Sequence, residues 1–265
     1  MKNTLPTKAS AKEVKTYKEE PWYHFKPEIN HEQKAVVIGA GISGVSVAYS
    51  LAKRGYEVTL VEKEPHVATK ASGNPVAVVM PLLTHKSDKV GQYYYQGFHY
   101  TLGVINDLMS NRHNVGWNPC GVLDISGKHN AQESIVTNEE LITLADDEIK
   151  KKCSHLLNNS ALFLPKAGMV NPKEFCKAML AEVKNHVKVI THANALYYSR
   201  NDNDDWIVRD HKKQIIANAP TLVLCQGESI LETQMGSWLP LKKVKGQLKY
   251  LSPMPITLNT IIRYN

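Results

Sequence analysis

The sequence predicts an α/β protein in which a parallel sheet, discontinuous in sequence, is interleaved with a mixed or antiparallel sheet. Three observations indicate this class. Residues 34–62 alternate between strand, helix and strand patterns, as a β-α-β unit does. A glycine-rich turn, GAGISG at 39–44, joins the first strand to the helix. Residues 188–217 then carry several short strand patterns with a polar turn between them, which is typical of antiparallel sheets.

Apolar periodicity and end signals define the first β-α-β unit. Residues 34–38 (KAVVI) form a short β-branched run typical of a buried parallel strand. Residues 42–54 place apolar side chains on one helical face, and Gly55 suits the left-handed conformation that ends a helix. Residues 56–62 (YEVTLVE) predict the second strand.

The later elements follow from the same signals. Helices are expected at residues 88–110, 134–157 and 173–185, the last with Pro172 close to its first turn. The remaining apolar runs predict strands at 121–125, 188–199, 205–210, 213–217, 220–227, 241–251 and 257–265, with a hairpin turn at 201–205 (NDNDD).

The composition is that of an ordinary globular protein, with 43% hydrophobic and 22% charged residues. A net charge of +7 favours a polyanionic partner at neutral pH. The four cysteines are scattered without a C-x-x-C pair, which argues against a disulfide framework and a thiolate zinc site. The eleven histidines show no metal-ligand spacing, so we expect no metal.

The eighteen uncharged residues at 35–52 are long enough to suggest a membrane span. Three glycines, three serines and a change of periodicity within them predict a strand, a turn and a helix instead. Residues 1–34 carry Lys and Glu throughout and lack the apolar core of a signal peptide. We therefore expect a cytoplasmic protein that does not enter a membrane.

The glycine-rich turn fits the G-x-G-x-x-G fingerprint of a dinucleotide-binding, Rossmann-like unit. Gly39 would make the tight turn, Gly41 would let the backbone approach a pyrophosphate, and Gly44 would let the helix pack closely on the strand. The N–H groups that open the helix would bind the phosphates.

Glu62 ends the second strand, where an acid binds a ribose diol and disfavours the 2′-phosphate of NADP. No Lys-Ser or Lys-Thr pair follows Gly44, so a P-loop is excluded. Which dinucleotide binds stays open at this point.

Residues 36–83, from VVIGAG to ASGNPVAVVMPLL, resemble the opening of the FAD-dependent D-amino-acid-oxidase (DAO) superfamily, which includes glycine and sarcosine oxidases. In that family the segment after the acidic residue leads into a Ser-Gly-Asn-like turn along the FAD pyrophosphate and the flavin. The resemblance implies FAD as the cofactor. It also implies no catalytic side chain, since the flavin itself accepts the hydride in the difficult step of the reaction. With the glycine motif, it gives these predicted cofactor-binding residues: Gly39, Ala40, Gly41, Ile42, Ser43, Gly44, Glu62, Lys63, Ser72, Gly73, Asn74, Val189 and Gly227.

Four stretches are similar to a group in this superfamily that modifies the wobble uridine of tRNA: ASGNPVAVVMPLL, CGVLDI, LFLPKAGMVNPKEFCKAML and PLKKVKGQLKYL. This likeness implies FAD-dependent oxidation of the secondary amine of 5-carboxymethylaminomethyl-2-thiouridine. It also implies tRNA as a partner and a methyltransferase encoded separately. Candidate phosphate contacts are Arg112, Lys128, Lys150–Lys152, Lys212–Lys213, Lys242–Lys243 and Lys245.

The element pattern and the resemblance together predict a leader and two interleaved domains. Residues 1–33, which are rich in Lys, Glu and Thr, would form a flexible leader. Residues 34–85 and about 165–235 would form a Rossmann-like FAD-binding domain, and about 86–164 and 236–265 a substrate domain with a mixed or antiparallel sheet. Family members continue for about a hundred further residues, a usual substrate-domain length, so we expect this substrate domain to be incomplete.

Two positions depart from the family pattern. Ala77 stands where the group commonly has Gly, and Lys245 stands where it usually has Arg. Lysine keeps the charge but loses the planar, two-pronged contact of arginine.

Two alternatives to the tRNA-modifying enzyme stay open. The first is an oxidase of a free amino acid such as glycine or sarcosine, which needs an arginine for the substrate carboxylate; Arg263 is a candidate. The second is a truncated, inactive protein that binds only a nucleotide or tRNA.

Overall fold

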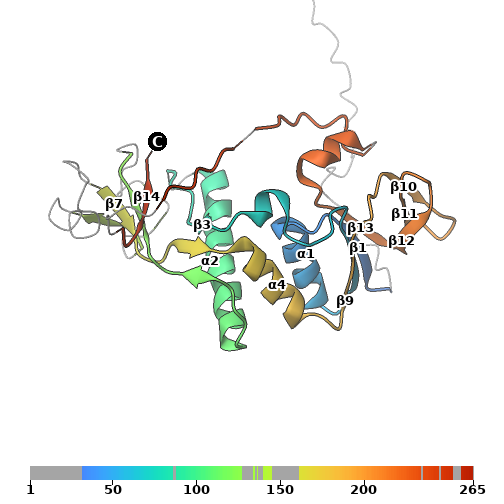
Figure 1. The fold of residues 1–265 in the computed structure, drawn as a ribbon, viewed down its shortest axis with the longest axis horizontal. Coiled ribbons are helices and arrows are strands. Elements are labelled where there is room, and N and C mark those ends of the chain that lie inside the picture. The colour runs from blue at the N-terminus through green and yellow to red at the C-terminus, as the bar shows by residue number, and fades with distance from the viewer. Residues whose placement is uncertain are drawn as a thin grey trace, which may run out of the picture. The chain divides into compact units, whose positions relative to one another are not determined.

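The computed structural model describes residues 32–85, 88–126, 134, 136, 140–144, 161–233, 235–244, 246–252 and 258–264 (Figure 1). The helices are α1 (Ile42–Ala52), η1 (Lys70–Gly73), α2 (Lys89–Ser110), α4 (Pro172–Glu182) and η3 (Gly227–Glu232). The strands are β1 (Lys34–Ile38), β2 (Glu57–Val61), β3 (Ala77–Val79), β4 (Trp117–Asn118), β5 (Val122–Asp124), β6 (Ile142–Leu144), β7 (Ala161–Leu164), β8 (Gly168–Val170), β9 (Val187–Ile190), β10 (Tyr197–Arg200), β11 (Trp206–Arg209), β12 (Ile215–Ala219), β13 (Thr221–Leu224) and β14 (Ile261–Arg263). Within these ranges, every helix is too short or too polar to cross a lipid bilayer.

A four-stranded parallel sheet organises the fold, with strand order β13-β1-β2-β9. β1 has the predicted bounds, and α1 and β2 lie within theirs, so the predicted β-α-β unit is confirmed. β9 and β13 come from much later in the chain, so the sheet is discontinuous in sequence, as expected. Because the strands are parallel, the segments that follow β1, β2, β9 and β13 all leave from the same edge.

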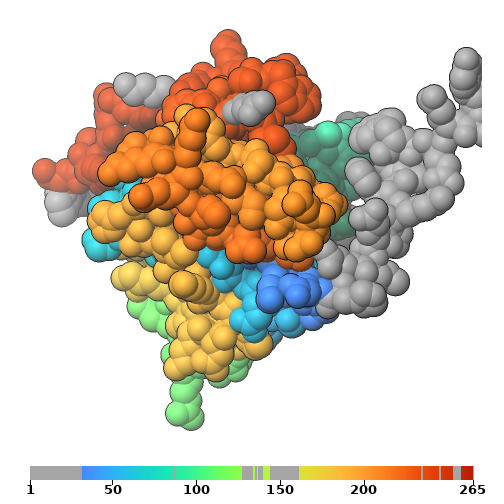
Figure 2. Space-filling view, turned by 90° about the vertical axis from the view of Figure 1, so that its right-hand side faces the viewer, coloured from blue at the N-terminus to red at the C-terminus, as the bar shows by residue number. Residues whose placement is uncertain are grey.

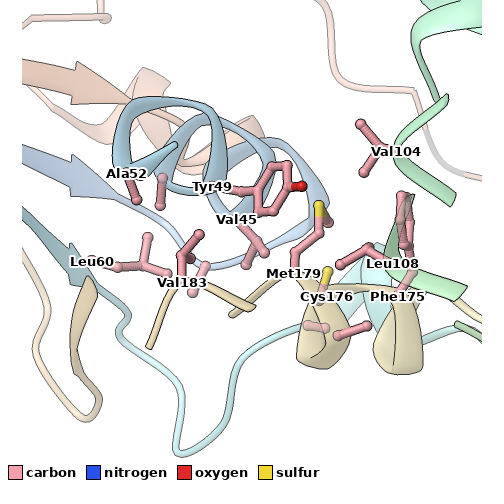
Figure 3. Close-up of a cluster of buried hydrophobic side chains, with 14 of the residues drawn as sticks. Val45, Tyr49, Ala52, Leu60, Val104, Leu108, Phe175, Cys176, Met179 and Val183 are labelled. Atoms are coloured by element: carbon pink, nitrogen blue, oxygen red, sulfur yellow. The ribbon is translucent and has the colours of Figure 1, made fainter. Parts of the chain in front are cut away.

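Helices cover one face of this sheet. Val45 of α1, Leu60 of β2 and Met179 of α4 are all buried in one cluster, which α2 extends with Leu108 (Figure 3). Full burial of each such side chain is worth about 1.5–3 kcal/mol. This cluster fixes α1, and therefore the glycine-rich turn at its start, against the sheet.

A three-stranded antiparallel sheet, β10-β11-β12, covers the other face. Val36 of β1 and Val208 of β11 are fully buried between the two sheets. Figure 2 shows this antiparallel sheet, in orange, in the middle of the face toward the viewer. The predicted turn at 201–205 is confirmed, because the Asn201 N–H donates to the Asp205 carbonyl at 3.0 Å.

Two smaller sheets complete the described fold. One has the order β14-β5-β7-β6, in which β14 and β5 are parallel and the other pairs antiparallel; the second, β3-β8-β4, is antiparallel. Phe98 of α2 and Val122 of β5 share a buried cluster. The parallel sheet with additional mixed and antiparallel sheets confirms the predicted fold class, whereas the predicted domain boundaries stay a prediction.

Two predicted elements are wrong. The helix predicted at 134–157 is contradicted by β6, whose residues pair with β7; much of the rest of that range lies outside the described residues. The strands predicted at 241–251 are absent from the described residues 241–244 and 246–251. Leu241 and Val244 are 54% and 85% exposed there, so an alternating pattern without a pairing strand does not become a sheet.

A buried carboxylate joins α2 to the segment before β6. The Tyr95 hydroxyl and the Lys166 ammonium donate to Glu140 at 2.5 and 2.9 Å, and His99 lies 3.3 Å away. Burial alone would raise the pKa of Glu140, but these hydrogen bonds and the charges of His99 and Lys166 outweigh it and lower the pKa below the usual 4.5.

We expect Glu140→Gln to lower the free energy of unfolding by about 2 kcal/mol at neutral pH, since hydrogen bonds to a charged group are lost. A lowered folded-state pKa stabilises the fold above the unfolded-state value and loses that contribution as the pH falls through the folded-state value. The difference from wild type should therefore shrink below about pH 4.5 in urea titrations. Glu232→Gln, which changes a 61% exposed carboxylate, is the control and should have little effect.

Candidate functional site

The glycine-rich turn leaves β1 at the carboxyl edge of the parallel sheet and opens α1. Gly39 has a φ of +96°, which side chains rarely adopt. A Cβ atom on Gly44 would lie 1.7 Å from the Gly39 carbonyl oxygen, so only glycine lets α1 approach β1 this closely. These contacts confirm the tight turn and the close packing predicted for the two glycines. In the first turn of α1, the N–H groups of Ser43 and Gly44 have no acceptor within the helix.

Glu62 follows β2 at the same edge and is 8% exposed. Its carboxylate accepts the Ala40 N–H at 2.6 Å through Oε2 and the Glu64 N–H at 2.9 Å through Oε1. The sequence predicts Glu62 only as a ribose ligand, and this second role depends on a contact with the backbone of the turn. Each carboxylate oxygen accepts more than one hydrogen bond, so Glu62 can hold the glycine-rich turn and still accept from a ribose hydroxyl.

Ser72 brings the predicted second loop to the glycine-rich turn. Its Oγ accepts the Ile42 N–H at 2.9 Å across a separation of 30 residues. A Cβ atom on Gly41 would lie 3.2 Å from this oxygen, so a side chain at Gly41 would fill the space between the two loops. The Ser72 hydroxyl retains its own proton for donation to an acceptor such as a phosphate. This narrow space, bordered by helix N–H groups, fits the diphosphate of FAD.

Gly73 ends η1, and the half-buried Asn74 follows it in an extended conformation. The Asn74 N–H donates to the Ala71 carbonyl at 3.4 Å. The structure therefore places all three residues of the Ser-Gly-Asn turn in one short segment, with Ser72 in contact with α1.

The other predicted residues lie on different segments. Lys63 follows Glu62, and its ammonium donates to the Ser229 hydroxyl in η3 at 2.8 Å. Gly227 opens η3 with a φ of +56°. Val189 lies inside β9 opposite Leu60, one strand further from the glycine-rich turn than Glu62, so the structure does not place it with the others. A cofactor-binding role for each of these residues stays a prediction.

The segment after β13 also reaches the glycine-rich turn. A Cβ atom on Gly39 would lie 2.5 Å from the Cys225 carbonyl oxygen and 3.2 Å from the Gln226 Cα. Burial raises the pKa of the Cys225 thiol, so this thiol is a packing group rather than a nucleophile. Gln226 is not among the predicted site residues, although a polar residue directly after a parallel strand is a signal for a site at that edge.

The remaining candidates lie elsewhere. The Arg263 guanidinium donates to the buried Asp124 carboxylate at 3.0 Å. Ala77 opens β3 and packs against the helix-side cluster. Among the candidate phosphate contacts, Arg112, Lys212, Lys213, Lys242 and Lys243 are exposed, whereas Lys128, Lys150–Lys152 and Lys245 lie outside the described residues. The described residues hold no group of three or more His, Cys, Asp or Glu side chains arranged for a metal ion.

Asn74→Ala should weaken FAD binding about three- to tenfold, the effect of one lost hydrogen bond, and leave the melting temperature of the apoprotein nearly unchanged. The reason is that Asn74 lies outside the buried clusters, in a turn. Flavin fluorescence titration measures the affinity. An affinity equal to that of wild type would remove Asn74 from the cofactor site.

The sequence of this chain matches a known protein family and several known proteins. The sequence profile of the family "DAO: FAD dependent oxidoreductase" matches residues 34–264. The chain is 34% identical over 237 residues to the tRNA 5-methylaminomethyl-2-thiouridine biosynthesis bifunctional protein MnmC of Pseudomonas savastanoi. It is 29% identical over 250 residues to the MnmC protein of Pseudomonas aeruginosa. These matches cover 87% and 91% of this chain but 35% and 37% of the relatives, so the chain spans about a third of their length.

Solved structures share the fold at low sequence identity. An FAD-bound L-alpha-glycerophosphate oxidase from Mycoplasma pneumoniae has a TM-score of 0.63 at 17% identity, covering 74% of this chain and 54% of that one. Glycine oxidase from Geobacillus kaustophilus has a TM-score of 0.62 at 16% identity, covering 78% and 58%.

Proposed function

The chain belongs to the DAO family of FAD-dependent oxidoreductases, and on this premise we propose that it acts on tRNA. The proposed reaction removes the carboxymethyl group from 5-carboxymethylaminomethyl-2-thiouridine at the wobble position by oxidation. The observation that carries the proposal is the similarity to MnmC proteins over 87% of the chain. The net charge of +7 suits a polyanionic substrate.

In the proposed reaction, the main contribution of the protein is to bind and orient the cofactor and the substrate. FAD, when bound, supplies the acceptor for a hydride from the carbon next to the amine nitrogen. The resulting C=N bond of the substrate adds water and splits into glyoxylate and the aminomethyl nucleoside. The segments around Gly39, Glu62 and Ser72 would hold the adenosine diphosphate half of FAD, so that their contribution is to position the cofactor.

An oxidase of free amino acids is the second candidate, and it has less support. Such an enzyme needs an arginine that is available to a substrate carboxylate. Arg263, the candidate for this role, already forms an ion pair with Asp124, a residue 3% exposed. The third candidate is a protein that binds a nucleotide or tRNA without catalysis. A measurement of catalytic turnover distinguishes it from the first candidate.

The test uses the purified chain, FAD and tRNA isolated from cells that retain 5-carboxymethylaminomethyl-2-thiouridine. We expect yellow protein, loss of this nucleoside by mass spectrometry and one glyoxylate per nucleoside lost. Peroxide formation with glycine or sarcosine and unchanged tRNA would favour the amino-acid oxidase. FAD or tRNA binding without any turnover would favour the inactive binding protein.

We also propose a separate methyltransferase as a partner and a cytoplasmic location. The relatives are bifunctional by name, so a methyltransferase would supply the second activity of the same modification. Co-purification from cells that express both chains tests the partnership.

A further inference from the structure

A hydrogen-bonded cluster links the segments that follow β9 and β13, close to the glycine-rich turn. The Tyr198 hydroxyl lies 3.0 Å from the Ala195 carbonyl oxygen and 3.1 Å from Gln226 Oε1, and donates toward both. Gln226 Nε2 lies 3.4 Å from the same Ala195 oxygen. Two segments that are distant in sequence therefore share one polar contact.

Tyr198 is partly buried. It belongs to β10 and packs in the cluster between the two sheets, beside Ala195, which is 2% exposed. Burial raises the pKa of Tyr198 to about 12, so its hydroxyl keeps the proton that it donates throughout the physiological range.

Both ends of the cluster contact predicted cofactor-binding residues. On one side, the Cys225 N–H donates to the Ile38 carbonyl at 2.7 Å, and the backbone of Cys225 and Gln226 packs directly against Gly39. On the other side, the loop that holds Ala195 reaches Glu62, because the Ala193 N–H donates to the Glu62 carbonyl at 2.9 Å.

We propose that Tyr198 and Gln226 are positioning residues of the cofactor site: they hold the loops after β9 and β13 in the arrangement that binds the adenosine diphosphate half of FAD. Neither residue contacts the flavin in this proposal. The inference rests on the FAD binding of the proposed function and is independent of the tRNA substrate.

The test measures the dissociation constants of FAD and of ADP, which is the half that the two loops would bind. Tyr198→Phe and Gln226→Ala should each weaken both ligands by about three- to tenfold, the effect of one hydrogen bond. Because the two side chains are hydrogen-bonded to each other and to the same carbonyl oxygen, the double variant should lose less affinity than the two single losses combined. Gln226→Glu keeps an acceptor for the tyrosine but loses the Nε2 donor to the Ala195 carbonyl, so it should retain part of the affinity that Gln226→Ala loses.

Tyr197→Phe is the matched control, since Tyr197 is the preceding residue of β10, points to its other face and is 47% exposed. It should leave both constants unchanged. Unchanged constants in Tyr198→Phe and Gln226→Ala, fully additive effects, or equal losses in Gln226→Glu and Gln226→Ala would each overturn the proposal. A wild-type protein that binds neither FAD nor ADP would overturn it together with the proposed function, whereas FAD binding without action on tRNA would contradict only the latter.

Discussion

Gly44→Ala is expected to abolish stable FAD binding and to lower the free energy of unfolding by about 3 kcal/mol, the upper range for an overpacked site. The added Cβ would lie 1.7 Å from the Gly39 carbonyl oxygen and 3.3 Å from the Cys225 Cβ. The first of these is a backbone atom in the turn that opens the site, so it cannot yield without moving the turn. The start of α1 would then shift away from β1, and its N–H groups would leave the phosphate position.

Flavin absorbance of the purified protein and urea unfolding of the apoprotein measure the two effects. Gly103→Ala is the control, because Gly103 lies in α2, where an added Cβ atom would point into open space. That substitution should stabilise the helix by roughly 0.5–1 kcal/mol through reduced chain entropy. A Gly44→Ala protein that retains flavin would show that α1 need not approach β1 closely for binding.

The parts of the site that sequence analysis predicted are those with strong local signals. Gly39, Gly44 and Glu62 lie within a single β-α-β unit, where turn geometry and strand ends fix their relative positions. Ser72 was predicted through family resemblance rather than spacing, since its contact with Ile42 crosses 30 residues.

The parts that sequence analysis missed depend on long-range packing. Tyr198 and Gln226 are 28 residues apart and meet because the β10-β11-β12 sheet packs on the parallel sheet that contains β13. The error at residues 142–144 has a similar cause: pairing with β7 outweighs a charged, helix-like local pattern. In both cases the decisive partner lies in a segment distant in the sequence, so local periodicity does not indicate it.

Glu62→Gln is expected to weaken FAD binding at least about tenfold and to lower the free energy of unfolding of the apoprotein by about 1.5–3 kcal/mol. Both carboxylate oxygens accept backbone N–H groups, from Ala40 and from Glu64. The amide offers only one acceptor oxygen, and its NH2 group would face the other N–H. The glycine-rich turn would therefore lose its anchor at the same time as the cofactor loses a ribose acceptor.

The control is Glu57→Gln, at the other end of β2. Glu57 lies at the amino end of the strand, where its exposed carboxylate is 2.9 Å from His186, and exposed pairs contribute about 0–1 kcal/mol. FAD titration of both variants, with urea unfolding of the apoproteins, separates the two contributions of Glu62. Loss of stability with unchanged FAD affinity would make Glu62 an anchor of the turn alone. Loss of affinity with unchanged stability would make it a ribose ligand alone, because the backbone contacts would then contribute nothing to folding.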